Sequence, residues 1–234
     1  MIGGVETFFA HPGHVERVAR AAAEGRRGFA AAVADRPLYQ TRAGAALIPV
    51  AGPLLSKGGY DGSYGVTSYD YLAAALAHAA AAASVSHIVL AVDSPGGMVA
   101  GVDGAAEAIR QARQIKPVTA MVDGAAFSAA YWLASQADEI VMTPLSEAGS
   151  IGVVQAHIDV SKRLDDFGVK VTLLHAGAKK IDGHPFAPLP ARVRDDFSAR
   201  LEDLRGRFAA AVAEGRGLDR RAVLDTEADT FPAD

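Results

Sequence analysis

Residues 87–101, "HIVLAVDSPGGMVAG", decide the fold class of this chain. An unbroken apolar run at 87–93 stops at a Ser-Pro-Gly-Gly turn, and a helix-forming stretch follows at 101–115. The run predicts a strand that is buried on both faces, because helices cover both sides of a parallel sheet. The stretch is therefore interpreted as one strand–turn–helix unit of an α/β domain.

The same alternation extends in both directions from this unit. Further helices are predicted at 69–83, with Thr67 or Ser68 as N-cap, from near Ser128, at 159–168 and at 191–215. Further strands are predicted at 45–54, 117–123, 139–144, 149–156 and 169–177, and a glycine-rich loop at 56–68. This order predicts a mainly parallel sheet flanked by helices.

Composition bounds the class of protein. The chain has 234 residues and is half apolar, enough for one principal domain, expected at 44–234 after a peripheral helical segment and connector at 1–43. A net charge of −4 without a basic block argues against nucleic acid as a partner. The absence of cysteine excludes disulfides and thiolate chemistry. No signal peptide or membrane-length apolar run is recognised, so a soluble protein is expected.

The glycine turn has two possible chemical uses. Strand-to-helix turns expose backbone N–H groups, which can bind a phosphate or an oxyanion. Gly96 and Gly101 have the spacing of a phosphate-binding Walker A motif, but Val102 and Asp103 stand where lysine and serine or threonine are required. A tight turn without chemistry stays open as the alternative.

Ser128, in "GAAFSAAYWL" (124–133), fits two roles. A serine at the start of a helix is most often an N-cap. As a nucleophile it needs space for a substrate carbonyl beside its hydroxyl and the next N–H. Its neighbours are small: Ala125, Ala126, Ala129 and Ala130. A nucleophilic serine also needs a base, and the residues alone do not choose between His157, Lys179 and Lys180.

Four stretches in order resemble a known family: "DSPGG" (93–97), "FSAAYWLASQAD" (127–138), "GSIGV" (149–153) and "HAGAKKIDGHPF" (175–186). They are similar to the signature series of the SppA-type serine peptidases, and within these to the head-maturation proteases of lambda-like tailed phages. The resemblance covers roughly residues 44–231. It implies a ClpP/crotonase-like α/β fold built from repeated ββα units.

The resemblance assigns roles position by position. Ser128 matches the nucleophile, and Lys180, 52 residues later (180 − 128), matches the general base. Ser150 matches a serine that orients the lysine amine. The N–H groups of Gly97 and Ala129 match the oxyanion hole.

Some positions of this sequence depart from the patterns of ClpP and of bacterial SppA. Lys179 falls on a non-catalytic position, and Val153 stands where ClpP has its histidine, which supports the lysine as base. Ala129 and Ala130 stand where bacterial SppA usually has glycines. The membrane anchor of bacterial SppA is not found, which favours the phage branch. The chain stops at "DTFPAD" (229–234), where family members continue, so a truncated domain is expected.

The resemblance implies a serine endopeptidase with a Ser–Lys dyad, acting in the bacterial host cytoplasm on phage scaffold, portal or capsid proteins. It implies no metal or cofactor. Extended substrate is expected to bind by strand addition near the glycine turn. A homo-oligomer is expected, because neighbouring protomers of bacterial SppA can share one site. The alternatives are an SppA-like peptidase that degrades signal peptides, a crotonase-type acyl-CoA enzyme and a non-catalytic assembly or scaffold protein.

Overall fold

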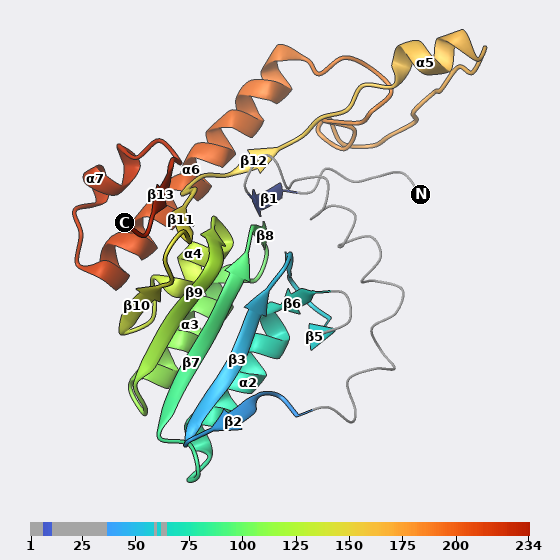
Figure 1. Ribbon diagram of the computed structural model, residues 1–234. Coiled ribbons are helices and arrows are strands. Elements are labelled where there is room, and N and C mark those ends of the chain that lie inside the picture. The colour runs from blue at the N-terminus through green and yellow to red at the C-terminus, as the bar shows by residue number, and fades with distance from the viewer. Residues whose placement is uncertain (1–6, 11–36, 59, 62–64) are drawn as a thin grey trace.

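The computed structural model describes residues 7–10, 37–58, 60–61 and 65–234, which form two sheets and a set of helices (Figure 1). The helix expected within the first 43 residues falls at positions outside these ranges.

The larger sheet is mainly parallel, as predicted. Its strands are β2 (Gln40–Arg42), β3 (Ala45–Ala51), β7 (His87–Ser94), β9 (Val118–Phe127), β10 (Glu139–Met142), β11 (Glu147–Gly149) and β13 (Thr230–Pro232). The order is β13-β11-β9-β7-β3-β2, and β10 pairs with β9. The inner pairs are parallel, and the two end strands, β2 and β13, run antiparallel to their neighbours.

A second sheet stands near the carboxyl ends of these parallel strands (Figure 1). Its strands are β1 (Thr7–Ala10), β4 (Leu54–Leu55), β5 (Tyr60–Asp61), β6 (Val66–Ser68), β8 (Gly96–Met98) and β12 (Val154–Gln155). Their order is β12-β1-β8-β4-β6-β5. The predictions of a bare turn at 94–97 and a loop at 56–68 are therefore partly wrong, because these glycine-rich stretches pair as short strands.

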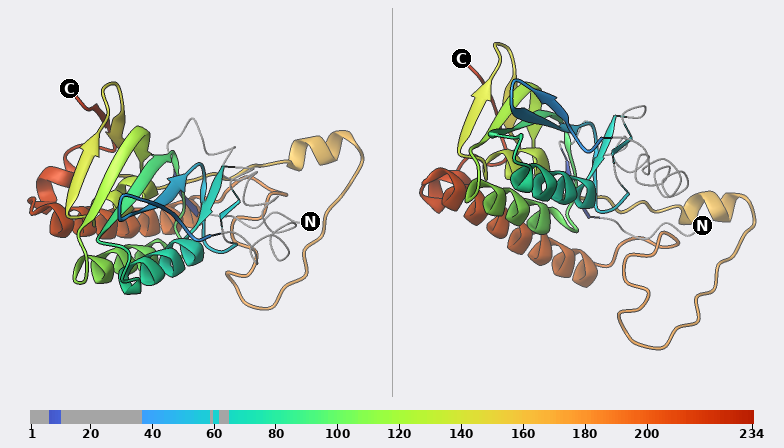
Figure 2. Two further views of the ribbon diagram at one scale, coloured as in Figure 1. Left: turned by 60° about the horizontal axis from the view of Figure 1, so that its bottom comes forward. Right: turned by 90° about the horizontal axis from the view of Figure 1, so that it is seen from below.

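The helices are α2 (Tyr69–Ala81), α3 (Val102–Arg113), α4 (Ala129–Ala134), α5 (Ser161–Asp166), α6 (Ala191–Arg216) and α7 (Arg220–Leu224). The first begins at a predicted cap, where the Ser68 hydroxyl accepts the N–H of Tyr71 at 3.4 Å. Figure 2 shows α2, α3 and α6 on the same side of the larger sheet. In the core, the fully buried Phe208 of α6 stacks on Trp132 of α4, with ring centroids 4.8 Å apart.

The opposite face of the larger sheet is open in the part of the chain that the structure describes (Figure 2). In β7, Leu90 and Val92 are buried against the helices, whereas Ala91 and Asp93 are exposed. The prediction that 87–93 is buried on both faces is therefore wrong. An apolar run alone does not reveal this, because a small residue such as alanine can stand on either face.

Residues 156–190, called the arm here, leave the body after β12 and return at α6 (Figures 1 and 2). The arm contains α5, close to the helix predicted at 159–168. The strand predicted at 169–177 is not formed, since the described chain offers it no pairing strand. Its Val169 and Leu174 are 47% and 94% exposed.

Candidate active site

Ser128 lies where β9 ends and α4 begins, in a backbone conformation that a non-glycine residue rarely adopts. Its φ is 54° and its ψ is −122°. Strained residues of this kind cluster at functional sites, and a sharp strand-to-helix turn is the way some hydrolases present a nucleophilic serine. The hydroxyl makes no capping bond to α4 but donates to the Gly152 carbonyl at 3.4 Å. This geometry does not fit an ordinary helix cap.

The backbone around Ser128 is fixed from two sides. Its N–H donates to the Gly149 carbonyl at 2.8 Å, and its own carbonyl accepts the Trp132 N–H at 2.9 Å. The side chain is fully buried. The serine therefore sits in a rigid part of the molecule, as a preorganised reacting group requires.

Ser150 lies beside this position because β9 and β11 run parallel, with Phe127 opposite Gly149. The residue after Gly149 is then Ser150, which is buried at 4% exposure and has a φ of 56°. Its N–H donates to the Asp229 carbonyl at 2.8 Å, next to β13. The structure thus brings the predicted nucleophile and the predicted orienting serine to adjacent strand ends.

The two predicted oxyanion-hole residues belong to neighbouring elements. Gly97 is on β8, which packs against α4, and Ala129 is the first residue of α4. The first N–H groups of a helix have no acceptor within the helix. A Cβ at Gly97 would lie 2.0 Å from the Leu54 carbonyl oxygen, so only glycine fits there. Both residues are buried close to the start of α4.

Two supports of β8 were missed by the sequence analysis. The Ser94 hydroxyl donates to the Gly52 carbonyl at 2.7 Å and accepts the Gly96 N–H at 3.1 Å. The Tyr69 hydroxyl donates to the Met98 carbonyl at 2.6 Å, and burial raises the pKa of Tyr69 above its usual range. The serine directly before Pro-Gly-Gly was a usable signal for the first support. Nothing in the sequence marks the second.

Lys180, the predicted base, lies elsewhere. It is exposed on the arm, in a turn where its N–H donates to the Gly177 carbonyl at 3.1 Å. The arm projects away from the strand ends in all views (Figures 1 and 2). Among the described residues of a single chain, Lys180 is therefore not brought against the buried Ser128.

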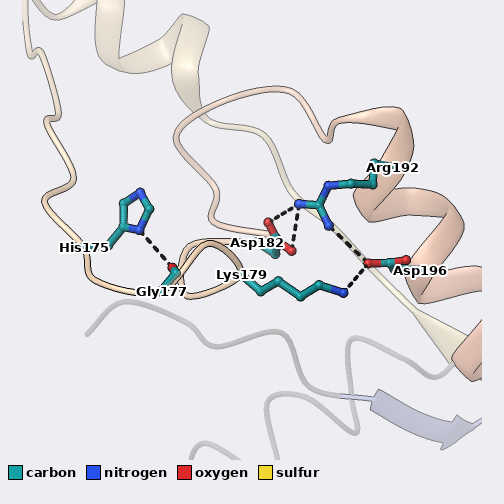
Figure 3. Close-up of polar contacts among 6 residues, drawn as sticks. All are labelled: His175, Gly177, Lys179, Asp182, Arg192 and Asp196. Atoms are coloured by element: carbon teal, nitrogen blue, oxygen red, sulfur yellow. Dashed lines mark hydrogen bonds and ion pairs between the residues drawn. The ribbon is translucent and has the colours of Figure 1, made fainter.

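A set of ion pairs, called the clasp here, holds the turn of Lys180 to the start of α6 (Figure 3). Arg192 donates to both carboxylate oxygens of Asp182, at 2.8 and 3.0 Å, and to Asp196 at 3.2 Å. Lys179 donates to the same Asp196 at 3.1 Å, and this bond lowers the pKa of Asp196. Lys179 is thus engaged in the clasp.

His157, the third candidate base, is also on the arm. Its Nε2 lies 3.1 Å from the His184 carbonyl oxygen, so this ring contacts the arm itself. Within the described ranges, no group of three or more histidine and acidic side chains is arranged to hold a metal ion.

None of the described helices is both long and apolar enough to cross a membrane.

Comparison with known proteins identifies the family. The model of peptidase family S49 matches residues 110–230, just over half of the chain. The chain belongs to peptidase family S49. The match includes Ser128, Ser150 and Lys180, whereas Gly97 precedes it. The match to the family model thus includes both the strand ends around Ser128 and the arm.

Two similar curated proteins come from phages. The head-tail preconnector protein GP5 of Enterobacteria phage P21 is 41% identical over 195 residues, 83% of this chain and 39% of the relative. Capsid assembly protease C of Escherichia phage lambda is 40% identical over 194 residues, 82% of this chain and 44% of the relative. The chain spans less than half the length of either.

A bacterial relative is less similar to this chain. The putative signal peptide peptidase SppA of Enterococcus faecium is 30% identical over 149 residues, 61% of this chain and 42% of the relative. The predicted resemblance to SppA-type peptidases and to lambda-like phage proteases is confirmed by these similarities.

Proposed function

We propose that this chain is a serine endopeptidase in which Ser128 attacks a peptide carbonyl and Lys180 is the base. The observation that carries the proposal is the backbone of Ser128, whose φ of 54° and ψ of −122° hold a buried hydroxyl at a sharp strand-to-helix turn. Strain of this kind persists only where the surrounding structure enforces it. Membership of a peptidase family supports a nucleophilic role for this strained serine.

The proposed mechanism gives each group the role that the family resemblance implies. An uncharged Lys180 takes the proton of Ser128 as the hydroxyl attacks the carbonyl carbon. The N–H groups of Gly97 and Ala129 bind the oxyanion, and Ser150 orients the lysine amine. The lysine returns the proton to the leaving amine, and water then hydrolyses the acyl-enzyme.

The dyad is proposed to form between two chains. A lysine base must be uncharged, and removal from water is what favours the uncharged amine. Lys180 is exposed in the single chain, and a second copy packed over it would remove its amine from water. The arm also carries apolar side chains that its own chain leaves exposed, at Ile158 (69%), Phe167 (72%) and Leu174 (94%). An arm placed on the next copy is a head-to-tail contact, and such contacts can close into a ring.

The substrates proposed are phage scaffold, portal or capsid proteins, processed in the host cytoplasm, with no nucleic acid and no cofactor. Similarity to the capsid assembly protease of phage lambda and to the preconnector protein of phage P21 supports this substrate class. The finer fold assignment, repeated ββα units of the ClpP/crotonase type, belongs to the same proposal, and the domain predicted at 44–234 also includes β1 and β2, which pair in its sheets. The SppA relative supports a second candidate, degradation of signal peptides.

The test compares single variants in a cleavage assay with phage scaffold and portal proteins as substrates. We expect Ser128→Ala and Lys180→Ala each to lower cleavage by on the order of 10⁴-fold or more. Lys170→Ala, which removes another exposed lysine of the arm, is the matched control and should cleave normally. Full cleavage by either active-site variant contradicts the dyad.

A second assay separates the rival activities. An acylating serine reagent should label the parent chain at Ser128 and leave Ser128→Ala unlabelled. Cleavage of a synthetic signal peptide at a higher kcat/KM than the phage proteins would favour the SppA-like function. Turnover of an acyl-CoA thioester without labelling would favour the crotonase-type reading.

A further inference from the structure

The strand β1 pairs with two strands that lie far from it in the sequence. Residues 7–10 lie inside the second sheet, between β8 and β12, and pair antiparallel with both. Phe9 is opposite Gly97, and Thr7 is opposite Gln155. Without β1, the edges of β8 and β12 would face each other across the width of a single strand.

The space between the edges of β8 and β12, which β1 fills, is called the slot here. Both of the strands that border it belong to the candidate active site. β8 contains Gly97, the proposed oxyanion donor, and β12 follows Gly152, whose carbonyl accepts the hydroxyl of Ser128. A peptide in the slot would therefore run alongside the nucleophile. It could form backbone hydrogen bonds on both sides, which is how extended peptides add to sheets.

The residues that border the slot favour replacement of β1 by another extended peptide. Gly96 and Gly97 have no side chains, so the backbone of any extended peptide can approach them closely. Four strands of this sheet, β8, β4, β6 and β5, pair with one another without β1, whereas β12 pairs only with β1 among the described residues.

We propose that residues 7–10 occupy the cleft in which protein substrates bind, so that β1 is an internal competitor of the substrate. The nature of the competing ligand, an extended protein segment, rests on the proposed function. Substrate must displace β1 before it reaches Ser128. The opposing possibility is that β1 is a permanent strand of the sheet, and the experiment decides between them.

A disulfide can lock β1 in place, because the chain contains no cysteine of its own. Thr7 and Gln155 are directly opposite in an antiparallel pair, a geometry whose Cα separation suits a disulfide. The variant is Thr7→Cys/Gln155→Cys. The control is Arg42→Cys/Ala45→Cys, which joins the antiparallel pair β2/β3 away from the cleft.

The readout is peptide binding in a Ser128→Ala background, where nothing is cleaved. The probe is a fluorescein-labelled peptide with the sequence of residues 5–12, VETFFAHP, titrated by fluorescence anisotropy. We expect the locked chain to bind it at least tenfold more weakly than the reduced chain, with no such change in the control. A second variant, Phe8→Pro/Phe9→Pro, removes backbone donors of β1 and should bind the probe at least threefold more tightly than its parent.

Equal binding by locked and reduced chains overturns the proposal, as does failure of the Thr7/Gln155 disulfide to form within one chain. Cleavage is measured separately in chains that retain Ser128, where locking should abolish it and reduction restore it. If no chain cleaves a phage protein but locking still weakens peptide binding, the proposed function fails and the internal competitor stands.

Discussion

The strand ends around Ser128 and the arm around Lys180 are built in opposite ways. Ser128 and Ser150 are buried, and backbone bonds from neighbouring strands fix them. Lys180 is exposed, and the arm that carries it leaves apolar side chains such as Leu174 open to solvent. The contrast agrees with the proposal that Ser128 is already positioned in a single chain, whereas Lys180 needs a second copy to complete the dyad.

The largest expected effect tests the rigid half. Phe208→Ala removes the fully buried ring that stacks on Trp132 and should lower the free energy of unfolding by about 3–5 kcal/mol. Leu174→Ala, at 94% exposure on the arm, should change it by no more than about 0.5 kcal/mol under conditions where the chain is a monomer. Urea unfolding measures both. Similar losses would mean that the arm is packed as tightly as the core.

The next largest effect is expected on cleavage and tests whether Gly97 belongs to the oxyanion hole. Gly97→Ala places a Cβ 2.0 Å from the Leu54 carbonyl oxygen and must displace β8. We expect cleavage to fall by about 10²- to 10³-fold, the usual loss when an oxyanion donor is removed. Gly104→Ala, on α3 with no atom within 4 Å of the added Cβ, is the control and should cleave normally. Normal cleavage by Gly97→Ala would exclude β8 from the site.

The smallest effect concerns the clasp. Arg192→Ala removes the bonds to Asp182 and Asp196 and frees the turn of Lys180, so cleavage should fall roughly three- to tenfold. The free energy of unfolding should change little, because exposed ion pairs contribute little. Arg194→Ala, whose partner is the exposed Asp195, is the control. An unchanged kcat for Arg192→Ala would show that the clasp does not position the lysine.

The pH dependence of the clasp follows from Asp196. Its pKa is lowered by the bond from Lys179, so the charged form is favoured in the folded chain. The stabilisation is present above the unfolded pKa of an aspartate and is lost as pH falls through the lowered folded value. The ratio of parent to Arg192→Ala activity should therefore be constant between about pH 6 and pH 9, since aspartates ionise well below this range.

The sequence predicted the parts of this molecule that local chemistry decides. The alternation of apolar runs and helical stretches was enough for a mainly parallel sheet, and Ser68 was a recognisable cap for α2. The positions of Ser128 and Ser150 at adjacent strand ends follow from parallel pairing of β9 with β11. The strain at Ser128 was not predictable, because φ and ψ at one residue are set by the contacts around it.

The sequence did not predict what depends on pairing over long distances. The alternating apolar residues of 169–177 suggested a strand, but a strand needs an edge to pair with. Conversely, β1 and β8 are too short to show a pattern, and their pairing joins segments almost ninety residues apart, as with Phe9 and Gly97. The open face of the larger sheet was not predicted either. An apolar run does not show whether other layers cover one face of the strand or both.

A mixing experiment tests the central claim most directly. Ser128→Ala chains and Lys180→Ala chains, each inactive alone and each folded, are combined and allowed to exchange subunits before cleavage is measured. If the dyad forms between chains, the one-to-one mixture should recover about a quarter of the parental activity, since random pairing joins intact Ser128 to intact Lys180 in that share of head-to-tail contacts. A mixture that exchanges subunits and stays inactive would contradict the shared site.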